Sequence, residues 1–173
     1  MQINKLQPPD HTIRAAYNAL TEDLEQNIKN LTVRFFQNIL SCKPGCADCC
    51  VKFSVLPLEA AIIAERLSGR VPPLTTTEGQ CCFLENNLCS IYNIRPIICR
   101  TQGLPIGYID EERGAIEVSC CPLNFAEDYQ FRSEELLFLD DFNSELARLN
   151  ALYCKSQGIN PLQRIALSDL IKG

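Results

Sequence analysis

The sequence has few of the residues that most catalytic sites require. Its single histidine, His11, lies far from the cysteines, which excludes a zinc finger built from two cysteines and two histidines. We interpret His11 as a solvated residue at the start of a helix. No pattern resembles a hydrolase triad, a pair of catalytic carboxylates or a phosphate-binding loop. The sequence therefore assigns no catalytic residue.

The sequence also lacks long apolar runs and an excess of positive charge. No run approaches the roughly 18 apolar residues that suggest a membrane span, and the first residues lack the charged-then-apolar pattern of a signal peptide. The net charge of -5 repels polyphosphates. We therefore expect a cytoplasmic protein without a nucleic-acid or membrane partner.

Cysteine, by contrast, is abundant. Ten of the eleven cysteines fall in three bursts, and the eleventh is Cys154. Thiols stay reduced in the cytoplasm, and a complete disulfide framework would leave one cysteine over, so the pattern favours metal binding over disulfides. The bursts are CKPGCADCC from residue 42, CCFLENNLCSIYNIRPIICR from residue 81 and SCCP from residue 119.

A metal or an iron-sulfur cluster needs several thiolates that converge from different directions, within about 2.3 Å of the metal. Close pairs such as Cys46 and Cys49 meet this need because a tight turn lets both sulfurs face one point. Zinc and an iron-sulfur cluster each take four thiolates. The spacing of the cysteines does not separate these two possibilities.

Length and periodicity predict a mainly α fold, as a single domain over residues 1–173 with two long amphipathic helices. The first helix begins after the cap Asp10 and ends before Pro44; the second begins at Ser133 and ends at Gly158. The apolar seam of the first is Ile13, Tyr17, Leu20, Leu24, Ile28, Leu31, Phe35 and Ile39, and that of the second is Leu139, Phe142, Leu146, Leu149 and Tyr153.

Shorter elements are expected between and after these helices. A short helix has Pro57 in its first turn and Gly69 as its stop, and a last helix starts at Asn160-Pro161. Residues 71–80 form a loop that is rich in proline and threonine. A turn at residues 86–87 precedes a helical turn after Tyr92, and residues 104–119 form a small β-hairpin.

The motifs C-x3-C-x2-C-C, C-x-F-L and C-S-I-Y-x-x-R-P-x-x-C-R run from Cys42 to Arg100. Together they resemble the zinc- or iron-chelating cysteine-cluster domain, the CxxCxxCC or YkgJ-like family, which includes the cysteine-rich part of flagellin lysine-N-methylases. The resemblance covers residues 42–121. The spacing from Cys42 to Cys46 is one residue longer than the family usually has, and Cys82 replaces a proline or an apolar residue.

The resemblance implies a set of metal ligands. It leaves Cys82, Cys120 and Cys154 outside the set, and Cys154 is interpreted as a small buried hydrophobic residue. Eight ligands suit two four-thiolate centres, or one centre and a set of reactive thiols, and the cofactor is a 4Fe-4S cluster or zinc. The implied ligands are Cys42, Cys46, Cys49, Cys50, Cys81, Cys89, Cys99 and Cys121.

Three functions are compatible with such a site. The first is a metal-binding protein whose centre is structural or transfers electrons. The second, by analogy with the flagellin methylases, is a protein lysine methyltransferase that uses S-adenosylmethionine, although no glycine-rich nucleotide loop supports it. The third is metal storage or delivery. Arg95 and Arg100 either pair with surface carboxylates, compensate the charge of a tetrathiolate centre or bind an anionic ligand.

Overall fold

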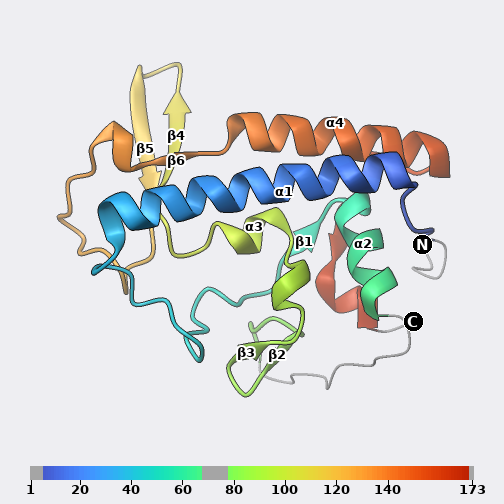
Figure 1. Cartoon of the computed structure of the whole chain (residues 1–173), viewed down its shortest axis with the longest axis horizontal. Helices are drawn as coiled ribbons and strands as arrows, with labels where there is room; N and C mark the ends of the chain where they lie inside the picture. The colour runs from blue at the N-terminus through green and yellow to red at the C-terminus, as the bar shows by residue number, and fades with distance from the viewer. Residues whose placement is uncertain (1–5, 68–77, 172–173) are drawn as a thin grey trace.

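The computed structural model describes residues 6–67 and 78–171, and its longest element is helix α1, His11–Leu31 (Figure 1). The Asp10 side chain caps this helix by accepting a hydrogen bond from the Ile13 amide at 2.9 Å. The helix continues into a π-helical turn over Thr32–Phe36. The first cysteine burst follows this turn in the chain.

Helix α4, Asp140–Gln157, packs along α1 (Figure 1). Its apolar face buries Leu149 and Tyr153, and it ends at Gly158, which has a φ of 65°. The Tyr153 hydroxyl donates a hydrogen bond to the Gln7 carbonyl at 2.8 Å, which fastens α4 to the segment before α1. The helices that precede and follow the cysteine-rich segment therefore pack against each other.

Helix α2, Pro57–Leu67, packs against α4 and starts at the predicted proline. Asn150 of α4 is buried between them, where its side-chain oxygen accepts a hydrogen bond from the Leu58 amide at 3.1 Å. Its nitrogen donates to the Pro161 carbonyl at 3.0 Å. The expected helix stop at Gly69, and most of the expected loop at residues 71–80, lie outside the described residues.

The strands are short and form three small sheets. The pairs β1 with β7, β2 with β3 and β4 with β5 are antiparallel, and β6 pairs with β4 in parallel. The hairpin of β4 and β5 lies within the predicted residues 104–119. The strands are β1, Ser54–Val55; β2, Leu84–Glu85; β3, Leu88–Cys89; β4, Ile106–Asp110; β5, Ala115–Ser119; β6, Leu137–Phe138; and β7, Ile165–Ala166.

The predicted fold class, mainly α with two long amphipathic helices, is wrong. Within the described parts of the chain only α1 is a long helix, and the second helix begins at Asp140 instead of Ser133. Residues 133–139 include a 3-10 turn and strand β6, because Leu137 and Phe138 pair with β4. The last predicted helix is replaced by β7 and the 3-10 turn Leu167–Ile171, because β7 pairs with β1. Pairing between distant segments leaves no trace in local periodicity.

Two apolar cores support the cysteine bursts. The first lies between α1, α2 and α4, and it includes Phe36 and Phe125, whose rings meet edge to face with centroids 5.3 Å apart. The second includes Cys81, Phe83 and Ile91, with contributions from α2 and from Ile165. Within residues 6–67 and 78–171, no helix has both the length and the apolar character needed to cross a bilayer.

Candidate metal centre

Three predicted ligands of the first burst and one of the third, Cys121, interact electrostatically. Burial raises the pKa of Cys49, and negative charge on Cys42, Cys46 and Cys121 raises it further. These four cysteines are called the first thiol set. Two turns shape the burst: the amide of Cys46 donates to the Lys43 carbonyl at 2.9 Å, and the next turn closes between residues 47 and 50.

Asn124 holds three segments of the chain together at this set. Its side-chain oxygen accepts a hydrogen bond from the Ser41 amide at 2.8 Å. Its nitrogen donates to the Gly103 carbonyl at 2.7 Å and to the Cys42 sulfur at 3.4 Å. Its own amide donates to the Cys121 carbonyl at 3.0 Å. The next residue, Phe125, is buried in the first core and so fixes the position of Asn124.

The other four predicted ligands are neighbours around the second burst and are called the second thiol set: Cys50, Cys81, Cys89 and Cys99. The amide of Cys81 donates to the Cys50 carbonyl at 2.9 Å, so the two bursts meet directly. Cys89 lies on β3 opposite Leu84. The hairpin turns at residues 86–87, two asparagines with φ of 49° and 61°, as predicted.

Cys99 reaches the second thiol set from a different direction. It lies on the four-residue helix α3, Ile97–Arg100, which follows a 3-10 turn over Tyr92–Ile94. The amide of Cys99 donates to the Pro96 carbonyl at 3.0 Å. The second set therefore combines a loop, two sides of a hairpin and a short helix.

Burial and mutual repulsion dominate the electrostatics of the second set. Burial raises the pKa of Cys99 to about 12, and the charges of Cys81, Cys89 and Cys50 contribute to the rise. Burial also raises the pKa of Cys50 to about 12, with contributions from the charges of Cys49, Cys89 and Cys81. A hydrogen bond from Cys82 lowers the pKa of Cys81 to about 6. The surroundings therefore favour the protonated form of Cys50 and Cys99 and the thiolate form of Cys81.

The structure does not bring the eight predicted cysteines to a coordination point. Among the described residues, no three Cys, His, Asp or Glu side chains are arranged so that they could hold one metal ion. The three remaining cysteines differ from one another. Cys82 is buried beside Cys81, Cys120 is half-buried against the first core, and Cys154 is fully buried in α4 as a small hydrophobic residue.

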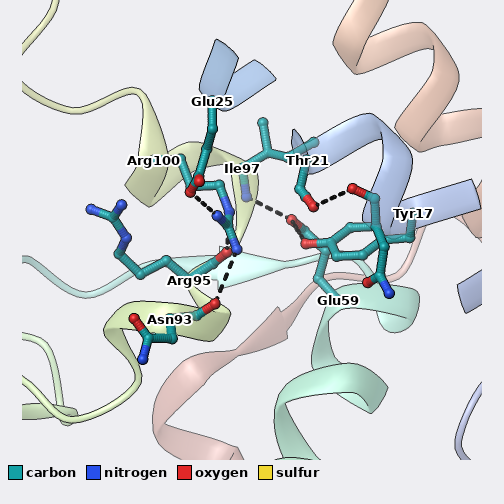
Figure 2. A network of polar contacts seen from close by, with 9 residues as sticks. Tyr17, Thr21, Glu25, Glu59, Asn93, Arg95, Ile97 and Arg100 are labelled. Atoms are coloured by element: carbon teal, nitrogen blue, oxygen red, sulfur yellow. Dashed lines mark hydrogen bonds and ion pairs between the residues drawn. The ribbon is translucent and has the colours of Figure 1, made fainter. Parts of the chain in front are cut away.

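The two arginines of the second burst have different environments (Figure 2). Arg100 forms an ion pair with Glu25 of α1, and its Nε donates to the Arg95 carbonyl at 2.8 Å. The Arg95 guanidinium stacks on Tyr92, 3.7 Å from the ring centroid. Burial raises the pKa of Cys89, and the positive charge of Arg95 opposes part of this rise. Arg100 thus pairs with a carboxylate, whereas Arg95 packs on an aromatic ring.

Sequence reasoning missed two residues that shape the site, Asn124 and Glu59. Asn124 gave no signal, since an asparagine in a loop is common. Glu59 lies in α2, where its carboxylate accepts hydrogen bonds from the Ile97 amide at 2.8 Å and the Tyr17 hydroxyl at 3.3 Å (Figure 2). Burial raises the pKa of Glu59. The available signal was a charged residue among the apolar residues of PLEAAII.

Comparison with known families identifies the cysteine-rich segment. Residues 41–122 match the model of the CxxCxxCC family, described as a "putative zinc- or iron-chelating domain". The match confirms the resemblance drawn from the cysteine motifs and supports metal binding through the cysteines. Comparisons with curated proteins and with solved structures gave no significant match.

Proposed function

We propose that the chain binds zinc or an iron-sulfur cluster at two thiolate centres, one in each thiol set. The observation that carries this proposal is the pattern of interactions among the predicted cysteines: the charges of Cys42, Cys46 and Cys121 act on Cys49, and those of Cys81, Cys89 and Cys50 act on Cys99. We assign the adjacent Cys49 and Cys50 to different sets, although their side chains share a hydrogen bond and the charge of Cys49 raises the pKa of Cys50. Hydrogen bonds support the division, since Asn124 joins Cys42 to Cys121 and a backbone bond joins Cys50 to Cys81.

The chemistry of the donors fits either metal. Four thiolates complete the tetrahedral shell of a structural zinc ion and are also the full ligand set of a 4Fe-4S cluster. The single histidine lies at the start of α1, so each set supplies sulfur alone. Thiolates require a reducing environment to stay free, so the proposal includes a cytoplasmic location.

The charge of the second set also favours a cation. Four thiolates close together repel one another, and this repulsion contributes to the raised pKa of Cys50 and of Cys99. A bound metal replaces the protons and offsets the negative charge. Burial raises the pKa of Cys89, and the positive charge of Arg95 opposes part of this rise.

The first test is the metal and acid-labile sulfide content, with the visible spectrum, of full-length protein purified without oxygen. A brown protein with iron and sulfide in equal amounts identifies clusters, whereas a colourless protein with two zinc ions per chain identifies zinc sites. Protein that holds no metal, and takes up neither zinc nor a reconstituted cluster, would refute the proposal.

Two adjacent substitutions test the division into two centres. Cys49→Ser should remove the metal of the first set, and Cys50→Ser should remove that of the second. Alkylation of free thiols, mapped by mass spectrometry, shows which cysteines the remaining metal protects. Cys120→Ser is the matched control, because Cys120 adjoins the ligand Cys121 but belongs to neither set, and both centres should remain. Loss of all metal in both Cys49→Ser and Cys50→Ser would contradict two separate centres.

A further inference from the structure

Glu59 is a buried carboxyl group that connects three helices beside the second thiol set. Its relative exposure is 4%, and Figure 2 shows its carboxylate between Tyr17 and Ile97. Tyr17 belongs to α1, Glu59 to α2 and Ile97 to α3. A carboxyl group at this depth requires hydrogen-bond partners, because it has lost its water. The Ile97 amide at 2.8 Å and the Tyr17 hydroxyl at 3.3 Å are such partners.

Helix α3 depends on this carboxylate because it has no cap of its own. The first amides of a helix lack partners within the helix, and a side chain at the cap position usually supplies one. Pro96 occupies that position and makes no side-chain hydrogen bond. Glu59 supplies the acceptor instead, from 38 residues away in the sequence.

The bond from Glu59 fixes the end of α3 that precedes Cys99. Ile97 lies two residues before Cys99, and a helix of four residues has little internal hydrogen bonding to set its own direction. The other end is held by Arg100, through its ion pair with Glu25 and its bond to the Arg95 carbonyl. The position of the Cys99 sulfur therefore depends on how α3 is attached to α1 and α2.

We infer that Glu59 is a positioning residue for the second thiol set, which orients Cys99 for metal binding by holding the amide of Ile97. Glu59 acts through α3 and does not bind the metal. This inference rests on the proposed function. It adds that metal binding by the second set depends on a residue outside the cysteine-rich segment, on a helix that carries no cysteine.

The test compares the full chain with two substitutions of Glu59 in metal-protection experiments. Glu59→Gln keeps a side-chain oxygen that accepts from Ile97, so protection of Cys99 should stay near that of the original protein. Glu59→Leu removes the acceptor. Metal affinity at the second set should fall by about tenfold or more, the range seen when outer residues that orient ligands are removed. The first set should keep its metal and its protected thiols.

A control separates positioning from a general loss of stability. Leu149 is buried in α4, so Leu149→Ala should lower the melting temperature without changing metal protection at either set. If Glu59→Leu does not fold, Glu59→Asp replaces it, since the shorter side chain withdraws the acceptor while keeping the charge. Glu59→Asp should then weaken protection of Cys99 and spare the first set.

Different results overturn the inference and the proposed function. The inference alone is overturned if the metal protects Cys99 equally in the original protein and in Glu59→Leu, or in Glu59→Asp where that variant replaces it. A parallel loss of metal from both sets that Leu149→Ala reproduces would also overturn it, because Glu59 would then be purely structural. Absence of protection at every cysteine of the original protein would refute the proposed function instead.

Discussion

The side-chain nitrogen of Asn124 lies 3.4 Å from the sulfur of Cys42 and donates a hydrogen bond to it. The same side chain holds the backbone at Ser41 and Gly103. Asn124 therefore fixes the position of Cys42 relative to these two segments.

Removing this side chain should weaken metal binding at the first set. We expect Asn124→Ala to lower the metal affinity of the first set by about tenfold, and to leave the second set unchanged. Metal titration followed by thiol alkylation would measure both effects. Asn143→Ala, at an exposed position of α4, is a matched control. Equal affinity in Asn124→Ala and the original protein would contradict a supporting role.

Substitution of Gly103 should also disturb the first thiol set. It has a φ of 94°, and a Cβ added there would lie 2.6 Å from the Cys42 sulfur. We expect Gly103→Ala to cost about 1 to 3 kcal/mol in unfolding free energy from backbone strain, and also to displace Cys42. Thermal unfolding and alkylation of Cys42 would measure the two effects separately.

Gly45→Ala is the control for this substitution. Gly45 has nearly the same φ, 95°, but its added Cβ would meet no atom within 4 Å. It should therefore show the cost of backbone strain without the collision. If both alanine variants release Cys42 equally, then the close approach of Gly103 to that sulfur has no special importance.

The stability of the metal-free protein should depend on pH through Cys50 and Cys99. Folding raises the pKa of each from 9.0 to about 12, so the folded chain holds these protons more tightly than the unfolded chain. Their contribution is fully present below about pH 9 and is lost as the pH rises towards 12. Urea unfolding across this range should show a smaller decline for Cys50→Ser than for the original protein. Equal declines would contradict the raised pKa.

Cys81 should change the stability of the metal-free protein with pH in the opposite direction. Its pKa is lowered to about 6 by the hydrogen bond from Cys82, so its contribution is present above about pH 9 and is lost as the pH falls through 6. Cys82→Ala should remove most of this dependence. Urea unfolding of the metal-free variant near pH 6 and pH 8 would measure the change, with Cys120→Ala as the control.

Arg95 should make metal binding at the second set possible at lower pH. Burial raises the pKa of Cys89, and the charge of Arg95 opposes part of this rise. We expect Arg95→Gln to move the pH midpoint of metal loading at this set upwards, because Cys89 then holds its proton more tightly. Arg95→Lys keeps the charge, so its pH midpoint should stay close to that of the original protein. A midpoint that is the same in all three proteins would exclude charge compensation by Arg95.

The two sets should lose their metal at different rates. Cys42 is exposed and its partners are half-buried, whereas the second set includes the buried Cys81 and adjoins the second core. We expect a chelator to remove metal from the first set before the second. Alkylation after increasing times would record the order in which the cysteines become reactive, and simultaneous release would contradict the prediction.

Sequence patterns predicted the elements that local chemistry determines. Asp10 as a cap, Pro57 in the first turn of a helix, Gly158 as a stop and the turn at residues 86–87 are all confirmed. Each depends on the backbone preferences of one or two residues. The family resemblance likewise followed from short motifs and is confirmed by the match over residues 41–122.

The elements that were missed depend on contacts between distant residues. Strand β7 pairs with β1 over two residues, and β6 pairs with β4 over two residues, lengths too short for a periodic signal. Glu59 is recognisable only once Ile97 lies against it.

The packing of α1 against α4 has a consequence for the entropy of the chain between them. Both cysteine sets lie within the loop that these helices close (Figure 1). Closing a flexible loop costs conformational entropy that grows only with the logarithm of its length, by about 0.6 kcal/mol for each doubling. The packing of the two helices therefore accounts for much of the conformational entropy that is lost when the segment is confined. A metal that binds within the segment then closes only smaller loops.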